Sequence, residues 1–279
     1  AVGSIGASDR HVTTDIDNVS ASAANGSIYL TEDDAAIVRD VAVTVTEFNS
    51  DATSTDITDA AQSDLATGAD GDIVLVATAG NITLNDGSDT DNISVTANGA
   101  GNILIDALAG SVTANADILS DTGDITITAA NDIEFTANVD VTTATPGTIS
   151  IDAETGTLTM DGTANVEATD SSARLNAALD VIVGNVTATN VSIVSGANIV
   201  NAVNSTKNVT ATNLRLAAVG SIGASDRHVT TNIDNVSASA ANGSIYLTED
   251  DAAIVTNVTV TVTAFNSDAT STDIIDAAQ

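Results

Sequence analysis

The sequence predicts an all-β protein, a parallel β-solenoid in which each turn of the chain takes about 20 residues. Three observations support this fold class. Short runs of alternating aliphatic residues follow a glycine or an asparagine along most of the chain. These runs recur at a regular spacing, and a long segment from the start of the chain is repeated at its end. Each feature is typical of a chain that coils repeatedly around one narrow core.

The repeated segment comprises the first 62 residues. Residues 1–62 realign without gaps on residues 218–279, with 56 identical positions. The six differences are Asp15/Asn232, Arg39/Thr256, Asp40/Asn257, Ala42/Thr259, Glu47/Ala264 and Thr58/Ile275. We therefore interpret residues 1–217 as one complete tandem repeat and residues 218–279 as the start of the next, and we expect a longer array.

The alternating runs predict short strands with one buried side. Alternation of apolar and polar residues has the period of a half-buried strand, and the residue before each run supplies a turn. No stretch of comparable length has helical periodicity. Runs of this kind begin at Gly26, Gly71, Gly80, Gly101, Gly123, Gly147 and Gly156.

The spacing of the strands predicts the length of one turn. Strand starts fall roughly every 8 to 10 residues, at Ile73, Ile82, Ile93, Ile103, Val112, Ile125 and Ile133. Every second start gives a step of about 20 residues, the length of a solenoid turn with two or three strands. We expect Ile73, Ile93, Val112 and Ile133 to form one inward stack, with neighbours ~4.8 Å apart.

One segment departs from the pattern, and one competing fold stays open. Residues 51–70 lack the alternation, so we expect a loop or a short helical excursion there. Just before it, Val43 and Val45 alternate with Ala42 and Thr44, which predicts that the valines point into the core and Ala42 points outward. An antiparallel sandwich could also be built from short strands with frequent turns, although two-residue hairpin signals are mostly missing.

Composition limits the classes of partner. The net charge is −32, from 38 acidic and 6 basic residues, so the surface would repel nucleic acid and anionic membranes. With 43% hydrophobic residues the chain has enough aliphatic surface to fold, and with 2% aromatic residues its core must consist of Val, Ile, Leu and Ala. The absence of cysteine excludes disulfides, and no stretch approaches the ~20 apolar residues that span a bilayer.

Several segments resemble the large secreted β-helical exoproteins of the filamentous haemagglutinin type. They are Gly3-Ser-Ile-Gly-Ala, Ser20-Ala-Ser-Ala-Ala-Asn-Gly-Ser-Ile-Tyr-Leu-Thr-Glu, their copies from Gly220 and Ser237, and the recurring Gly-Asp-Ile runs. The motifs are short, but the likeness extends through most of the chain. The resemblance implies a right-handed parallel β-helix, exported to the cell surface, that acts as an adhesin or a fibre.

The densest acidic cluster predicts a candidate calcium site. Asp86, Asp89 and Asp91 lie in the turn Asn85-Asp-Gly-Ser-Asp-Thr-Asp-Asn between two predicted strands. Calcium takes six to eight oxygen ligands, and three aspartates with nearby carbonyls could supply several of them. The spacing matches neither the EF-hand nor the calcium-binding solenoid repeat, so a solvated turn is the alternative. The same interpretation applies to Glu32, Asp33 and Asp34 and to their copies Glu249, Asp250 and Asp251.

Other residues give weaker signals. His11 and His228 have no second histidine or cysteine nearby, and the basic residues Arg174, Lys207 and Arg215 are isolated, so we expect no enzyme. Thr-x-Thr pairs of the kind that bind ice begin at Thr44, Thr126, Thr157, Thr187, Thr210 and Thr259; ordinary outward strand residues also explain them. Asn-x-Ser/Thr triplets begin at several positions, including Asn18, Asn81, Asn92, Asn190 and Asn208.

Together these features favour a non-enzymatic structural protein, an extracellular or cell-surface fibre or adhesin stalk built of tandem repeats. Its expected partners are further copies of the same repeat, in the same chain or by end-to-end or lateral self-association. No cofactor is implied unless calcium binds at Asp86, Asp89 and Asp91. The alternative class is a calcium-dependent binding module that contacts glycan or ice.

Overall fold

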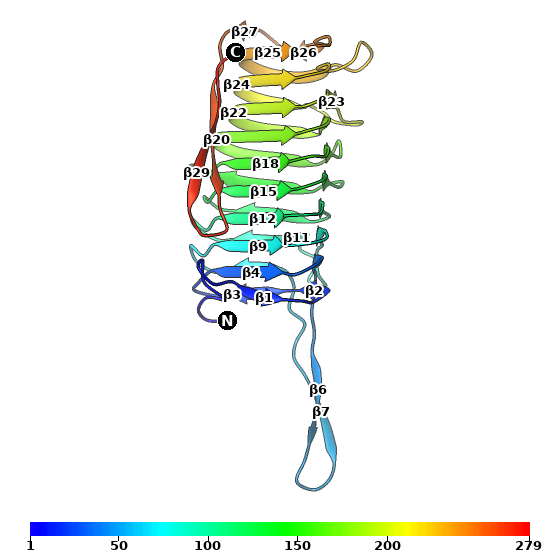
Figure 1. Cartoon of the computed structure of the whole chain (residues 1–279), viewed down its shortest axis with the longest axis vertical. Coiled ribbons are helices and arrows are strands. Elements are labelled where there is room, and N and C mark those ends of the chain that lie inside the picture. Colours follow the sequence, from blue (N-terminus) through cyan, green and yellow to red (C-terminus); the bar gives the residue numbers. More distant parts are fainter.

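The computed structural model describes residues 1–279 and is a parallel β-solenoid (Figure 1). The chain coils from the N-terminal end at the bottom of Figure 1 towards the top, and it contains strands but no helix. Every pairing between successive turns is parallel, and the two antiparallel pairings among the named strands join the arms of two hairpins. The antiparallel sandwich is therefore excluded.

The larger sheet has 17 strands and forms two columns along the coil. The first column contains β3 (Ala21–Ala23), β8 (Leu65–Thr67), β11 (Ile93–Ala97), β14 (Asp117–Ser120) and β17 (Asp140–Ala144). The second contains β1 (Val12–Thr14), β4 (Ile28–Glu32), β9 (Ile73–Ala77), β12 (Ile103–Ala107), β15 (Ile125–Ala129) and β18 (Ile149–Ala153). The long strands β20 (Asn165–Ala177), β22 (Asn185–Ser195), β24 (Val209–Ala218) and β25 (Val229–Ala240) join the two columns, and β26 (Leu247–Glu249) and β27 (Ile254–Val255) follow on β25.

The smaller sheet has eight strands and closes the coil. Its strands are β2 (Asn18–Val19), β5 (Ala36–Val38), β10 (Ile82–Leu84), β13 (Val112–Ala114), β16 (Ile133–Phe135), β19 (Leu158–Met160), β21 (Val181–Val183) and β23 (Ile199–Asn201). Most turns thus contribute three strand segments, one to each column and one to the smaller sheet. The inward residues of all three form one core of 54 buried residues.

The length of a turn agrees with the prediction, but the stacking of the strand starts does not. One inward position of the second column is held in successive turns by Ile103, Ile125, Ile149, Ala173, Val191, Leu214 and Val236, so these turns take 18 to 24 residues. Of the four residues predicted to stack, Val112 and Ile133 are direct neighbours, whereas Ile73 stacks on Ile103, and Ile93 lies in the first column. The prediction paired every second strand, but three segments make one turn.

The Gly-Asp-Ile runs mark a corner where backbones of successive turns meet closely. A side chain at Gly123 would overlap the carbonyl oxygen of Gly101 one turn below, so only glycine fits. The next residue forms a polar ladder, because the Asp72 Oδ1 atom accepts the Asn102 N–H at 3.0 Å and the Asn102 Oδ1 atom accepts the Asp124 N–H at 2.8 Å. Each turn therefore satisfies a corner amide of the next, as in side-chain ladders of stacked strands.

The segment around residues 51–70 is neither a loop nor a helix. β6 (Thr44–Phe48) and β7 (Ser54–Thr58) form an antiparallel hairpin, and the chain rejoins the coil at β8. The hairpin extends away from the coil beyond its N-terminal end (Figure 1). Val43 and Val45 are 51% and 56% exposed, so the prediction that they point into the core is wrong. Their alternation was correctly a strand signal, but it belongs to a strand that has no core beside it.

The second copy of the repeat folds differently at its end. Its hairpin, β28 (Val260–Phe265) and β29 (Ser271–Asp276), lies along the outside of the coil instead of projecting (Figure 1). The two copies also occupy different places around the coil. Ile28 pairs with Ile73 in the larger sheet, whereas its copy Ile245 is bridged through Ile222 to Ile199 and so continues the smaller sheet.

Candidate functional site

The predicted acidic turn lies beside a buried aspartate that the sequence did not single out. Residues 85–92 connect β10 to β11, and Asp64 directly precedes β8, the strand that pairs with β11. This pairing brings the turn against residues 63–64, because a side chain at Gly87 would overlap the Ser63 hydroxyl. The solenoid therefore joins two segments more than 20 residues apart in the sequence.

Asp64, Asp89 and Asp91 converge on one point. One carboxylate oxygen of each lies within 4.8 Å of the others. Asp64 is 6% exposed, and its Oδ1 atom has no hydrogen-bond partner. Asp86 also has a buried Oδ1 atom without a partner, whereas the Asp91 Oδ1 atom accepts the Ile93 N–H at 2.9 Å. Buried polar atoms are nearly always paired in folded proteins, so the two unpaired oxygens indicate a missing ligand.

The electrostatics of this acidic cluster also oppose an unoccupied, fully ionised state. Burial raises the pKa of Asp64 to about 7, and the charges of Asp89, Asp91 and Asp86 contribute to the same shift in that order. Burial also raises the pKa of the neighbouring Asp117, whose Oδ1 atom accepts a hydrogen bond from the Asn92 side chain at 3.1 Å. A divalent cation would offset both the repulsion and the desolvation of Asp64.

The donor set suits a hard cation such as calcium. Asp64, Asp86, Asp89 and Asp91 offer only oxygen atoms, and the site has neither histidine nor cysteine. Calcium would complete its six to eight ligands with backbone carbonyls or water. The sequence analysis named three of these four residues. It could not find Asp64, because no local motif marks a single aspartate that becomes a neighbour only through the coil.

The second predicted acidic segment is satisfied by the protein itself. Asp15, Glu32 and Asp34 also lie within 4.8 Å of one another. However, Glu32 accepts the Thr14 hydroxyl and, at 2.9 Å, the Ile16 N–H. Its copy Glu249 repeats both contacts, accepting the Thr231 hydroxyl and the Ile233 N–H. We therefore assign this glutamate a structural role in holding neighbouring turns.

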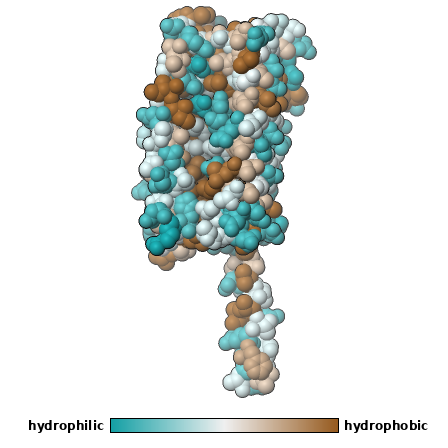
Figure 2. Space-filling model, viewed as in Figure 1, coloured by the Kyte–Doolittle hydropathy of each residue, from teal (hydrophilic) through white to brown (hydrophobic).

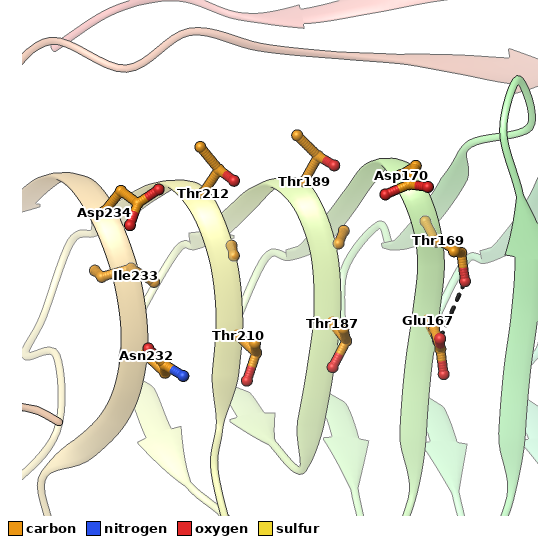
Figure 3. A pocket seen from close by; sticks show the side chains of 13 residues that line it. Glu167, Thr169, Asp170, Thr187, Thr189, Thr210, Thr212, Asn232, Ile233 and Asp234 are labelled. Carbon is orange, nitrogen blue, oxygen red and sulfur yellow. Dashed lines mark hydrogen bonds between the residues drawn. The ribbon is translucent and has the colours of Figure 1, made fainter. Parts of the chain in front are cut away.

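A shallow groove of about 370 Å³ crosses the upper turns of the first column (Figure 3). Thr187 and Thr210 lie in register on neighbouring strands, with Glu167 below them and Asn232 above. A parallel row follows the bend of the strands, where Thr189 and Thr212 stand between Asp170 and Asp234 (Figure 3). The groove lining includes neither a basic nor an aromatic residue.

The groove revises the interpretation of the Thr-x-Thr pairs. The sequence analysis compared pairs that begin about 30 residues apart, but those at Thr187 and Thr210 stack one turn apart. The threonine ladder covers only two turns, because acidic residues and an asparagine flank it on both sides. That area is small for recognition of an extended ice surface, so the stacked threonines by themselves do not define a binding face.

The two histidines form contacts between turns. The His11 and His228 Nδ1 atoms each lie 2.8 Å from a threonine hydroxyl of the next turn, Thr31 and Thr248 respectively. The His11 Nε2–H also donates to the Ser267 carbonyl oxygen at 2.9 Å. Neither histidine belongs to a group of potential metal ligands.

Comparison of the chain with protein-family models, with curated proteins and with solved structures finds no match. The fold class therefore rests on the strand pairing described above. The chain forms no helix long and apolar enough to cross a membrane.

Proposed function

We propose that the chain is a non-enzymatic structural protein, part of an extracellular or cell-surface fibre or adhesin stalk made of tandem solenoid repeats. The observation that carries this proposal is the continuity of the sheet across the repeat boundary. β24 ends at the first residue of the second copy, Ala218, and it pairs with β25 of that copy over nine residue pairs. A junction of this kind lets repeats be added without a break in the core.

The surface charge and the resemblance to filamentous haemagglutinin-type exoproteins support display outside the cell. A net charge of −32 keeps a long, narrow rod soluble and discourages lateral aggregation. The solenoid also places strand backbones at its two ends, where further repeats can pair with them. The proposed partners are accordingly further copies of the repeat.

Rods with increasing numbers of repeats test this proposal. Nine strands, from β1 to β24, stack along the second column within the first 217 residues. With ~4.8 Å between stacked strands, each added repeat should lengthen the rod by about 45 Å. Small-angle scattering or electron microscopy of chains with one, two and three repeats measures this increment. A radius of gyration that grows as for a flexible string of beads would contradict the proposal, and immunolabelling of intact producing cells tests surface display.

A calcium-dependent binding module is the second candidate, favoured by the unpaired buried oxygen of Asp64. In this function the cation would order residues 85–92, and the ordered turn or the threonine groove would contact a glycan or ice. Aromatic platforms for a glycan are scarce, because the chain has two tyrosines, and Tyr29 is 6% exposed. We therefore rank this function below the stalk.

Calcium titration distinguishes the second candidate. At constant ionic strength, calcium chloride should raise the melting temperature of chelator-treated protein and then saturate. Asp64→Asn and Asp89→Ala should abolish the response, whereas Asp226→Ala, an exposed aspartate outside the cluster, should leave it intact. A gradual rise that sodium chloride reproduces would reflect screening of the acidic surface alone and would argue against the site.

A further inference from the structure

The chain contains two hairpins of nearly identical sequence in two different environments. In β28–β29 and the residues just before it, the apolar side chains Val258, Val260, Val262 and Phe265 are buried, with exposures of 1% to 4%. In the first hairpin, Val43, Val45 and Phe48, which match the last three of these, are 51%, 56% and 74% exposed. Figure 2 shows apolar residues spaced along this projecting hairpin. One sequence is therefore observed both docked and free.

The docked hairpin covers a defined surface of the coil, which we call the docking face. It consists of the outward residues at one register position of the second column: Val74, Leu104, Thr126, Ser150 and Arg174. Although they point away from the core, the first four are at most 6% exposed. Phe265 packs with Val74, Leu104 and their neighbours Tyr29 and Val76 in a separate apolar cluster.

Polar contacts fix the position of the docked hairpin. The Phe265 N–H donates to the Thr126 hydroxyl, and the Thr263 N–H donates to the Thr148 hydroxyl, both at 2.8 Å. Arg174 forms an ion pair with Asp276 at 3.2 Å and another with Asp152 of the adjacent turn at 3.3 Å. Arg174 is one of only six basic residues in the chain, and here it neutralises a carboxylate of the hairpin.

Both hairpins extend towards the N-terminal end of the coil (Figure 1). β28–β29 leaves the last turn and runs back along the turns of its own chain, as far as the contact between His11 and Ser267. β6–β7 leaves the coil close to its N-terminal end and extends past that end (Figure 1). No turns of its own chain lie beside it, so its apolar stripe has no surface to cover.

We propose that β6–β7 docks on the docking face of a second copy of this chain, in the way that β28–β29 docks on its own coil. This inference rests on the proposed stacking function and names the surface that joins the copies. The docking residues are the same in both hairpins, since Val43, Val45, Phe48 and Asp59 match Val260, Val262, Phe265 and Asp276. Glu47 replaces the half-buried Ala264, a position from which a longer side chain reaches solvent. In the second copy, Arg174 then pairs with Asp59.

Tryptophan fluorescence can report the docking, because the chain has no native tryptophan. The donor is the full chain with Phe48→Trp, in which the new indole is exposed. The acceptor is the full chain with Val260→Asp and Val262→Asp, which removes its own hairpin from the docking face by burying two unpaired carboxylates. An acceptor that also carries Phe265→Trp verifies the opening by a shift of its emission to longer wavelength, and circular dichroism verifies the retained β-structure.

Mixing donor and acceptor should shift the emission of the donor's single indole to shorter wavelength, with saturation at increasing acceptor concentration. Sedimentation velocity should show a complex of two chains. A donor with added Val43→Asp and Val45→Asp should show neither effect, and wild-type protein as acceptor should give a much weaker shift because its docking face is covered. No shift with the open acceptor, or an equal shift with the wild-type acceptor, would overturn the inference. Either result would leave the rod-length test of the proposed function unaffected.

Discussion

Phe48 and Phe265 hold the same position in two copies of one hairpin, yet 74% of Phe48 and 2% of Phe265 is exposed. The sequence directly around them is the same except for Glu47 and Ala264. The difference in burial therefore arises from what lies beside each hairpin and not from its own sequence. This relationship allows matched substitutions that isolate the energy of docking.

Phe265→Ala should destabilise the docked hairpin by up to about 3 kcal/mol, because it empties a cluster formed by Tyr29, Val74, Val76 and Leu104. Phe48→Ala should change stability by less than about 0.5 kcal/mol, since the side chain is exposed. Hydrogen exchange of the amides in β28 and β29 measures the local effect. Equal exchange rates in both variants would mean that Phe265 is not buried in solution.

The core makes a second matched pair available. Ile127 points into the core at 0% exposure, and its neighbour Thr128 points outward. Ile127→Ala should cost about 2 to 5 kcal/mol through the cavity it leaves, whereas Thr128→Ala should cost less than about 1 kcal/mol. Chemical denaturation of the two variants checks the direction of the side chains. A larger loss for Thr128→Ala would require a shift of the strand by one residue.

Asp64 predicts a pH dependence of stability. Its pKa is about 7 in the folded chain against an ordinary value of 3.8, so the folded state binds the proton more tightly than the unfolded state. Without calcium, the contribution of Asp64 should be most favourable below about pH 4 and should be lost as the pH rises to about 7. Melting temperatures of the wild type and of Asp64→Asn, measured across this range, should differ in slope.

Two comparisons make the pH experiment specific. Burial raises the pKa of Asp106 to about 6, so Asp106→Asn should also flatten part of the profile. Saturating calcium should flatten the remaining slope only in chains that retain Asp64, because the cation holds that carboxylate ionised. Identical profiles for the wild type and Asp64→Asn would show that Asp64 is solvated.

Asn208 should not be glycosylated in the folded chain, although it begins an Asn-x-Thr triplet. It is 0% exposed, and its Nδ2 atom donates to the Val183 carbonyl at 2.7 Å and the Gly184 carbonyl at 3.1 Å. Asn208→Ala should therefore cost about 1 to 3 kcal/mol by leaving buried carbonyls unpaired. Asn81, which is exposed, serves as the comparison in both glycan mapping and denaturation.

The sequence allowed the coil to be predicted because its signals are local and repeated. Alternation identified strands such as Ile103–Ala107, and the turn length followed from their spacing. The grouping of strands into turns could not be read, since the weak strand at Asp117–Ser120 escaped notice and an interval of two strands resembled one turn. The role of Val43 failed for another reason, because alternation gives the shared side of a strand but not what covers it.

The candidate site shows the same limit. Asp86, Asp89 and Asp91 were found because they are dense in the sequence, whereas Asp64 joins them only through the pairing of β8 with β11. The docking face was equally hidden. Its members are single outward residues of five different strands, and a column of this kind becomes visible only when the register is known.

The displacement of the second copy around the coil has a consequence for any longer assembly. Ile28 and Ile245 are the same residue of the repeat, but they belong to different sheets, and their hairpins leave from different sides of the rod (Figure 1). If each junction adds the same displacement, the hairpins follow a spiral along the rod instead of a single line. Straps wound in this way would resist bending in every direction, as the strands of a rope do, and would leave no side of the rod as its weak side.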